Sequence, residues 1–395
     1  MMISRILMLL LSLKLVLGQT GLPTSASFST AIASNQLDQL SRFALNITKN
    51  LLRHPKGNCT LQDLQVRRDW RAFSATEKKA YIRSVLCLQA LPARTPSDLA
   101  AGAKTRYDDF VATHINQTLF IHRTGTFLGW HRWFIHEFES ALHNECSYTG
   151  DFPYWDWGAD ADDMENSEVF DGSDTSLSGN GAWIPAELDI KVPVGNYTPA
   201  YLPTGSGGGC VTNGPFVDYV VNMGPSFLSE PGGNITGMSN ALDYNPRCMT
   251  RDLTSAVLQR FNNYTSIVHL ILNNHNVWDF QTELQGIPGS GSLGVHGGGH
   301  YSMGGDPGRD ADGSPGEPGF WHHHGMIDRV WWIWQSLDLK TRQHAISGTG
   351  TFMNEPPSPN TTLDTIVNIG HANSGPVAME DLMSTTAGPF CYVYV

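Results

Sequence analysis

Apolar side chains recur at helical spacing in several stretches of the chain. In the first, ATEKKAYIRSVLCLQAL, they alternate with charged side chains, and Pro92 ends the stretch. The second is entered through Pro96, and the third begins at Trp130 with WHRWFIHEFE. The predicted helices are residues 75–91, 96–116, 130–146, 253–274 and 319–335. A mainly α-helical domain is the simplest interpretation.

Other regions lack this periodicity. Glycine, proline, serine and asparagine dominate residues 151–246, which predicts long irregular coil packed on the helices and held by Cys210 and Cys248. A linker is the alternative, but embedded aromatic side chains favour packed coil: Trp183, Tyr197, Tyr201 and Phe216. A glycine-rich loop is predicted at residues 286–319, and the final FCYVYV is strand-like. No repeat of fixed period is present, so one domain is expected.

Composition narrows the class of protein. With 41% hydrophobic and 16% charged residues, the sequence is typical of a globular protein. Its net charge is −12, and no dense cluster of lysine and arginine is present. A nucleic-acid partner is therefore not expected, because phosphate binding requires a basic face.

The first residues, MMISRILMLLLSLKLVLGQT, have the pattern of a secretory signal peptide. Arg5 precedes an apolar run that Lys14 interrupts, and cleavage near Gly18 or Gln19 defines residues 1–18 as the predicted signal. The run is too short for a membrane span, and no later run approaches ~20 apolar residues. Six cysteines suit an oxidising compartment, and their 15 possible pairings stay open. We expect a secreted, extracellular monomer with disulfide bonds, glycosylated at some of its sequons, which begin at Asn46, Asn58, Asn116, Asn196, Asn234, Asn263 and Asn360.

A first group of histidines has the spacing of a metal site. His114, His122 and His131 are 8 and 9 residues apart. We expect His114 to close one helix, His131 to open the next and His122 to lie on the connection, so that the three imidazoles converge on one ion. His136 follows His131 by five residues and turns away.

A second group lies in HGGGHYSMGGD and the triplet that follows it. His296 and His300 are spaced i, i+4, so on a helix their rings share one face, and Gly297 leaves room beside a metal. Successive helical positions differ by about 100°, so only one histidine of the 322–324 triplet can complete this group. Beside His324, Asp328 is a candidate acceptor for a ligand's free N–H or for Arg132.

Two groups of three imidazoles restrict the metal and the chemistry. Without a cysteine or carboxylate ligand in sequence reach, they select against Ca²⁺ and Mg²⁺ and leave Zn, Cu, Fe or Ni. The protease motif H-E-x-x-H is absent, since glycines follow His296, and no P-loop or G-x-S-x-G elbow is present.

Five stretches together resemble the tyrosinase, catechol oxidase and hemocyanin family of type 3 copper proteins, and in particular its short secreted fungal polyphenol oxidases. They are YDDFVATH, HRTGTFLGWHRWFIHEFE, PYWDW, HGGGHYSMGGDP and FWHHHGMIDRVWWIWQ. The resemblance extends from about residue 67 to the end, where Tyr392-Val393-Tyr394 is similar to the family's Tyr-x-Tyr motif. It implies a central four-helix bundle that holds a dicopper site, wrapped by long irregular loops with a few short strands. Residues 19–395 are then one copper catalytic domain without a C-terminal shielding domain.

When the family's ligand positions are transferred to this sequence, the resemblance implies which histidines bind two copper ions. In the F-W-x-H-H pattern the last histidine binds, which here is His324, and His322 stands in the variable slot. Phe320 resembles the aromatic that packs over the imidazoles of copper B, and Phe120 stands where some members carry a cysteine thioether. The implied ligands are His114, His122 and His131 for copper A, and His296, His300 and His324 for copper B.

The resemblance also implies the reaction, in which O₂ oxidises small phenolic substrates and no protein side chain beyond the metal ligands is catalytic. Strong monophenol hydroxylases commonly have asparagine after the first copper B ligand and an upstream glutamate, which together hold a water. Here Gly297 follows that ligand, Gln285 or Glu283 stands upstream, and Tyr301 is expected at the substrate mouth. We therefore expect oxidation of o-diphenols to exceed hydroxylation of monophenols. The alternatives are a full tyrosinase, a hemocyanin-like O₂ carrier and a secreted zinc hydrolase.

Overall fold

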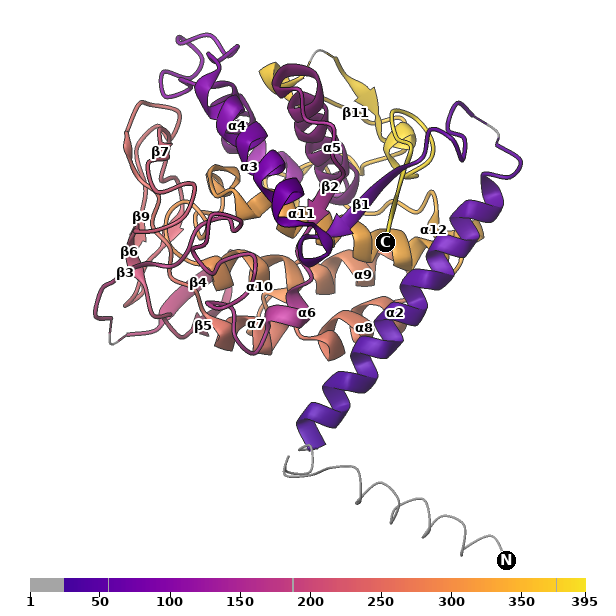
Figure 1. Cartoon of the computed structure of the whole chain (residues 1–395), viewed down its shortest axis with the longest axis horizontal. Helices are drawn as coiled ribbons and strands as arrows, with labels where there is room; N and C mark the ends of the chain where they lie inside the picture. The colour runs from indigo at the N-terminus through magenta and orange to yellow at the C-terminus, as the bar shows by residue number, and fades with distance from the viewer. Residues whose placement is uncertain (1–24, 56, 187, 374) are drawn as a thin grey trace, which may run out of the picture.

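The computed structural model describes residues 25–395 apart from residues 56, 187 and 374 (Figure 1). The predicted signal peptide, residues 1–18, lies outside these residues. Within them, no helix combines the length and the apolar character that a membrane crossing requires.

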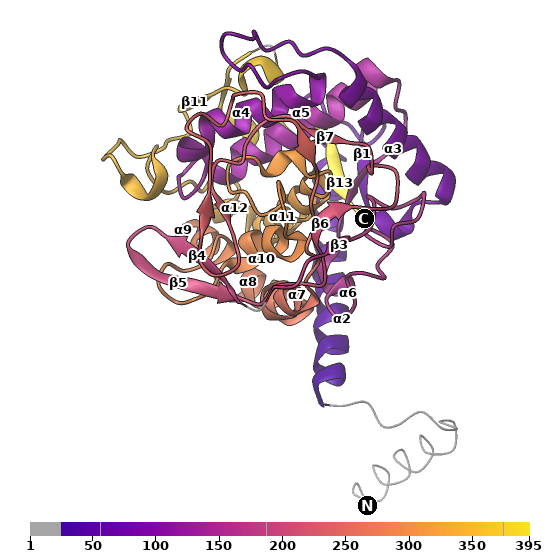
Figure 2. The same ribbon diagram turned by 90° about the vertical axis from the view of Figure 1, so that its left-hand side faces the viewer.

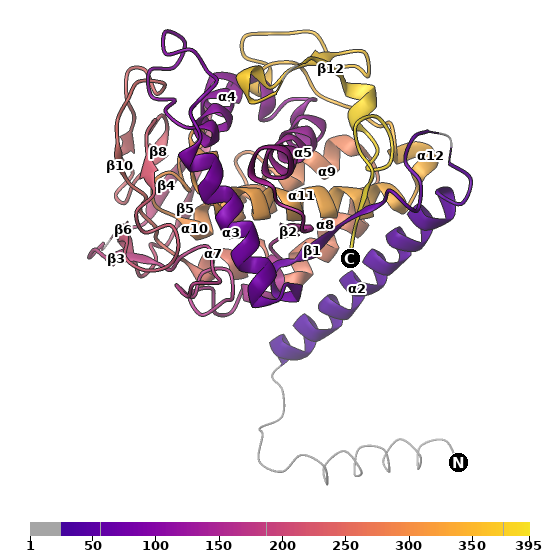
Figure 3. The ribbon, with the colours of Figure 1, turned by 45° about the horizontal axis from the view of Figure 1, so that its top comes forward.

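A bundle of long helices forms the centre of the molecule. Its most buried member is α11 (Gly319–Ser336), every residue of which is buried. Helix α5 (Phe127–Cys146) packs along α11, and α10 (Gly294–Met303) and α4 (Arg106–Ile121) contact this pair (Figures 1 and 3). The mainly helical fold predicted for residues 75–91, 130–146 and 319–335 is thus confirmed, with α3 at Ala75–Ala90.

Helix α4 begins later and ends later than the sequence predicted. The Thr105 hydroxyl accepts the N–H of Asp108 at 3.2 Å, and the Asp108 carboxylate accepts the N–H of Thr105 at 2.9 Å. This capping box fixes the first turn at Arg106, so the prediction of a helix from residue 96 was wrong. The helix then continues to Ile121, well past residue 116.

The remaining helices surround this bundle. Helix α2 crosses α8 and α11 on one side of the molecule (Figure 1). The helix predicted at residues 253–274 is two helices, because the Asn263 side chain caps α8 by accepting the N–H of Ser266 at 2.9 Å. Helices α2 and α9 were not predicted, and α10 lies inside the predicted glycine-rich loop. Their bounds are α2 Ser25–Leu51, α6 Trp157–Asp160, α7 Ser255–Phe261, α8 Tyr264–Asn273, α9 Val277–Leu284 and α12 Leu339–Arg342.

Strands are short and lie mostly outside the bundle. A parallel sheet has the order β13 (Tyr392–Tyr394), β1 (Gln65–Asp69), β2 (Phe152–Tyr154), which confirms the terminal strand. Two-stranded ribbons cover one side of the bundle (Figure 2). They pair β3 (Gly181–Trp183) with β6 (Gly208–Val211), β4 (Ile190–Val194) with β5 (Tyr197–Leu202), β7 (Val220–Val221) with β10 (Arg247–Cys248), and β8 (Leu228–Ser229) with β9 (Ile235–Thr236). A further ribbon, β11 (Ile366–Val367) with β12 (Val377–Ala378), lies apart from these four (Figure 1). Short 3-10 turns are η1 Trp70–Ala72, η2 Ser314–Gly316, η3 Phe352–Asn354, η4 Gly370–Ala372 and η5 Met379–Leu382.

The aromatic side chains of the irregular region do not behave alike. Phe216 is fully buried, as packed coil requires. Trp183 is 70% exposed, and Tyr197 and Tyr201 are each more than half exposed. The region packs on the helices, as predicted. Of the four aromatic side chains on which that prediction was based, however, only Phe216 is buried.

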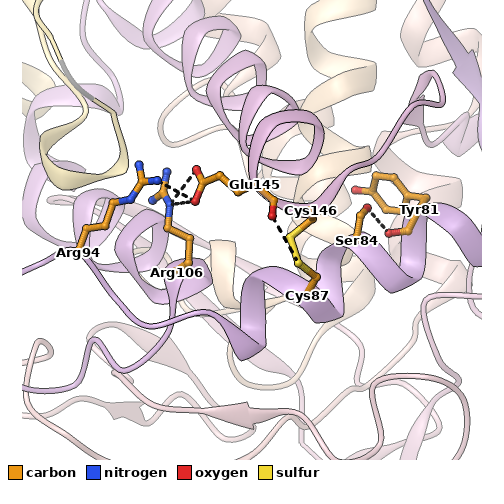
Figure 4. The surroundings of a disulfide bond; sticks show 7 residues. All are labelled: Tyr81, Ser84, Cys87, Arg94, Arg106, Glu145 and Cys146. Atoms are coloured by element: carbon orange, nitrogen blue, oxygen red, sulfur yellow. Dashed lines mark hydrogen bonds and ion pairs between the residues drawn. A yellow bond between two sulfur atoms is a disulfide. The ribbon is translucent and has the colours of Figure 1, made fainter.

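Three disulfide bonds join segments that are distant in the sequence. Cys87–Cys146 joins α3 to the end of α5, beside the Glu145 carboxylate that binds Arg94 and Arg106 (Figure 4). Cys210–Cys248 pairs the two cysteines expected to hold the irregular region, and Cys59–Cys391 closes the third bond. Such bonds suit an oxidising compartment.

Candidate metal centre

The first three predicted histidines converge on one point beside α4 and α5. His114 lies in the middle of α4, His122 directly follows that helix and His131 lies in α5, so the expectation that His114 closes its helix was wrong. One ring nitrogen from each lies within 4.8 Å of the others. The Nδ1–H groups donate to backbone carbonyls: His114 to Asp312 at 2.6 Å, His131 to Phe127 at 2.8 Å and His122 to Thr118 at 3.0 Å. The Nε2 atoms of His114 and His131 are left buried without a partner.

The second group lies opposite, on α10 and α11. Ring nitrogens of His296, His300 and His324 gather within 4.8 Å, together with one from His323. The Nε2 atoms of His300 and His324 are 3.3 Å apart, which is the spacing of two nitrogens that share an ion about 2 Å from each. The Nε2 atom of His296 is buried and has no partner.

The triplet on α11 divides as helix geometry requires, with one exception. The His322 ring turns away and meets Trp70 and Tyr81 edge-on, each at 5.0 Å between ring centres. His324 lies toward the first group, stacked on His131 at 4.6 Å. His323 was expected to leave the site, yet its ring lies 4.5 Å from that of His300.

The two groups face each other across the bundle. Besides the His131–His324 stack, His122 and His296 lie 5.7 Å apart between ring centres. The Phe320 ring packs against His324 at 4.2 Å and also contacts His114 and His300. The sequence-predicted role of Phe320 as an aromatic cover is consistent with this position.

Burial keeps these imidazoles neutral. Desolvation is the main reason that the pKa of His114, His131, His296, His300 and His324 lies well below its usual value, and neighbouring imidazoles lower it further. Burial lowers the pKa of His122 to about 4. Neutral imidazoles with free ring nitrogens are ligands for copper or zinc rather than calcium or magnesium, so the residues present fit two such ions.

The three glycines between His296 and His300 have different neighbours. A Cβ on Gly299 would lie 2.2 Å from the His323 ring, and one on Gly298 would lie 2.0 Å from Asn262 Oδ1. A Cβ on Gly297 would meet only the Leu293 side chain, at 2.9 Å from its Cβ. Helix α10 therefore needs glycine at 298 and 299 for close packing, whereas Gly297 borders open space.

A pocket of about 450 Å³ leads to the site. His122, His296 and His300 line it, together with Gly297 and Tyr301. The end of β4 with the residue that follows it (residues 192–195) and the segment 308–312 form its walls. The Tyr301 hydroxyl lies 3.2 Å from Ser229 Oγ. Tyr301, predicted to lie at the substrate mouth, thus lines a pocket that leads to the histidines.

Gln285 and Glu283 were the two candidates for the position at which strong monophenol hydroxylases have a glutamate. Only Gln285 lines the pocket. Its Oε1 accepts the backbone N–H of Arg123 at 2.8 Å. Glu283 points elsewhere, to His269 at 2.9 Å and Asn274 at 2.7 Å. An amide, not a carboxylate, therefore stands beside the site.

Asp328 binds Arg132 and not a ligand N–H. Arg132 Nε donates to Oδ1 at 2.6 Å, and the hydroxyls of Tyr392 and Tyr394 each donate to Oδ2 at 2.6 Å. Arg67 donates to Oδ2 at 3.3 Å and bridges to Glu139 on α5. This buried network ties α5 to α11, and the Tyr-x-Tyr motif takes part in it.

Sequence reasoning missed several residues that shape the site. Asp312 and Thr118 orient His114 and His122 through their carbonyl groups, which no side-chain pattern signals. Arg123 and Arg309 line the pocket. The position of Arg123 directly after a predicted ligand was the available signal.

Comparison with known proteins decides the family. The family model described as the common central domain of tyrosinase matches residues 104–337. The chain belongs to the tyrosinase family. Tyrosinase P of Aspergillus terreus is 40% identical over 352 residues, which cover 89% of this chain and 97% of that protein. An N-acetyl-6-hydroxytryptophan oxidase of Emericella nidulans is 38% identical over 85% of this chain and 93% of its own length.

A solved structure supports the same family assignment. A polyphenol oxidase variant from Thermothelomyces thermophila has a TM-score of 0.85 and 39% identity, covering 91% of this chain and 98% of that one. This tyrosinase-family protein is a type 3 copper oxidase. Its two histidine clusters are consistent with the binuclear copper site of the family.

Proposed function

We propose that this tyrosinase-family protein oxidises o-diphenols to o-quinones with O₂ and hydroxylates monophenols only weakly. In this proposal His114, His122 and His131 hold one copper ion, and His296, His300 and His324 hold the other. When bound, the two ions supply the exchange of two electrons with O₂. The chain itself orients the imidazoles, admits the phenol and excludes bulk water.

We assign His324 rather than His323 as the third ligand of the second ion because of the direction in which its ring points. Its Nε2 faces that of His300, and its ring stacks on His131 of the other cluster. His323 lies behind this arrangement, against the backbone of Gly299 and 5.2 Å from the Trp157 ring. We propose that His323 supports His300 by packing.

The observation that carries the diphenolase preference is the lack of a free carboxylate beside His296 among the described pocket residues. Gly297 has no side chain, and Gln285 presents an amide whose oxygen is occupied. Asp310 accepts the N–H groups of Ser226 and Phe227, and Asp312 accepts the Ser226 hydroxyl. A phenol with a pKa of about 10 thus finds little help in losing its proton.

Initial rates on catechol and on phenol, with copper-loaded protein, test this preference. We expect fast catechol oxidation and a slow phenol reaction with a lag. In the Gly297→Asn/Gln285→Glu double variant the phenol-to-catechol rate ratio should rise about tenfold, because a positioned base contributes at least that much. Equal rates on both substrates without a lag in the unmodified protein would contradict the proposal. Reversible O₂ binding without catechol oxidation would indicate a carrier instead.

We also propose that the protein is secreted. The signal-like residues 1–18 and the three disulfide bonds support export. N-terminal sequencing of protein recovered from culture medium should begin near residue 19, whereas retention of residue 1 in the cell would refute export.

A further inference from the structure

Arg123 occupies an unusual position at the pocket. It directly follows His122 and lines the same pocket as His296 and Gln285. Its backbone has a φ of 55°, in the left-handed region that non-glycine residues seldom adopt. Such a conformation costs free energy and persists where the surrounding structure requires it. Here it directs a half-buried guanidinium into the wall of the pocket.

The contacts of this guanidinium are all with neutral groups. Its Nη2 donates to the carbonyl of Gln285 at 2.7 Å, and its Nη1 donates to that of Gly286. Among the residues that the structure describes, no carboxylate forms an ion pair with it. These two contacts hold the side chain in place but leave its charge without a counterion, which is costly for a partly buried cation.

The other charged side chains of the pocket have partners. Arg309 lies 3.5 Å from the Asp252 carboxylate. Asp310 accepts two backbone N–H groups, and Asp312 accepts the Ser226 hydroxyl at 2.5 Å. Arg123 is thus the pocket cation that a ligand is best able to neutralise.

We propose that Arg123 binds the carboxylate of the substrate, so that the pocket selects phenols with an anionic arm over neutral phenols. This inference rests on the proposed oxidation of o-diphenols and names their class, the catechols that carry a carboxylate on a short chain. The planar guanidinium suits a carboxylate, since its remaining N–H groups form a fork. Arg123 is a specificity residue and takes no part in the reaction itself.

A pair of substrates that differ only in charge tests the proposal. The probes are 3-(3,4-dihydroxyphenyl)propionate and its methyl ester, oxidised by copper-loaded protein. We expect kcat/KM for the acid to exceed that for the ester about tenfold, mainly through KM, because the ion pair is only partly shielded from water. In Arg123→Gln the ratio should fall to about one, because kcat/KM for the acid should fall more than that for the ester. Arg123→Lys, which keeps the charge but loses the fork, should retain an intermediate ratio.

Arg260→Gln is the matched control. Arg260 also donates to two backbone carbonyls, those of Tyr201 and Gly291, both at 2.9 Å, but it lies outside the pocket. This variant should keep the preference for the acid. Raising NaCl from 20 to 500 mM should weaken the preference for the acid and leave the ester unaffected, because salt screens a partly exposed pair.

Binding without chemistry separates this proposal from the proposed function. Ligand-observed NMR on copper-free protein should show that 3-phenylpropionate binds, that its amide binds more weakly, and that Arg123→Gln removes the difference. Protein that oxidises neither catechol but still binds the acid through Arg123 would refute the proposed function alone. Equal kcat/KM for acid and ester in the unmodified protein, or an equal loss on both in Arg123→Gln and Arg123→Lys, would overturn the role of Arg123.

Discussion

In the first histidine cluster every Nδ1 atom faces a backbone carbonyl, at 2.6 Å for His114, 2.8 Å for His131 and 3.0 Å for His122. In the second, the Nδ1 atoms of His300 and His324 are buried and have no such partner. The rings of the second cluster are held by what packs around them: Phe320, the backbone at Gly299 and the adjacent His323 ring.

The difference indicates two ways of presenting an imidazole to a metal. A hydrogen bond from Nδ1 fixes both the tautomer and the tilt of the ring, so the Nε2 lone pair is aimed before an ion arrives. Packing fixes the position of a ring but leaves its tautomer free. We therefore expect the second cluster to be the more sensitive to changes in side-chain volume, and the first to changes in the loop that carries Asp312.

The largest expected effect comes from removing the residue at which the two clusters meet. His324→Ala should leave one copper ion per chain and lower kcat by roughly 10³ or more, because the chemistry needs both ions. The same truncation at the neighbouring position, His323→Ala, should retain two. Copper content by plasma mass spectrometry measures both variants, and loss of copper from His323→Ala but not from His324→Ala would reverse the ligand assignment.

The next largest effect concerns the network that both clusters share. Asp328→Asn leaves Arg67 and Arg132 with less negative charge in a buried site, so unfolding free energy should fall by about 3–5 kcal/mol. Tyr392→Phe removes one donor to the same carboxylate and should cost about 1–2 kcal/mol. Urea unfolding of copper-free protein gives both values. A loss below 1 kcal/mol for Asp328→Asn would show that the network does not join α5 to α11.

A smaller effect distinguishes two glycines of the second cluster. In Gly299→Ala the new Cβ would lie 2.2 Å from the His323 ring, and overpacking should cost about 1–3 kcal/mol and loosen copper at this cluster. In Gly297→Ala the new Cβ would lie 2.9 Å from the Leu293 Cβ, a milder clash, and the gain in helix propensity, up to about 1 kcal/mol, offsets part of its cost. Thermal unfolding and copper retention against a chelator compare the pair. Equal losses in both variants would contradict a packing role specific to Gly299.

The smallest effect is a change in the pH dependence of copper-free protein. Burial lowers the pKa of His322 to about 3, whereas in the unfolded chain it is about 6.5. Between these values the unfolded chain binds a proton that the folded chain does not, so stability falls as pH falls below about 6.5. His322→Phe should reduce this slope by at most about 1.4 kcal/mol per pH unit. Urea midpoints at pH 7.5, 6.5 and 5.5 measure it, and an unchanged slope would indicate that His322 is protonated in the fold.

The sequence predicted the parts of this site that depend on local periodicity. The i, i+4 spacing correctly placed the rings of His296 and His300 side by side. The 100° step between successive helical positions correctly turned His322 away from His324. The resemblance added the metal. The helix starting at residue 96 was wrong because the Thr105 capping box outweighs the apolar pattern before it.

Other features could not be predicted because they depend on contacts between distant segments. The backbone carbonyl of Asp312 accepts the hydrogen bond from His114, although the two residues are 198 positions apart in the sequence. Because a backbone group makes this contact, the type of side chain at position 312 does not reveal it. His323 stays beside His300 because Gly299 lets two helices approach closely, a tertiary effect that single-helix geometry omits. The sequence could not show which of Glu283 and Gln285 lines the pocket, because this depends on where α9 ends.

The parallel pairing of β1 with β13 has a consequence for how the protein is made. Gln65 pairs with Tyr392, and Cys59 is bonded to Cys391, a separation of 332 residues. A ribosome releases β1 long before β13 exists, so β1 can pair early with β2 on one edge, but its other edge stays open through most of synthesis. The two tyrosines that bind Asp328 arrive with that late strand. The link between α5 and α11 therefore gains these two hydrogen bonds only after β13 has been made, although Arg132 and Asp328 can already join the two helices before then.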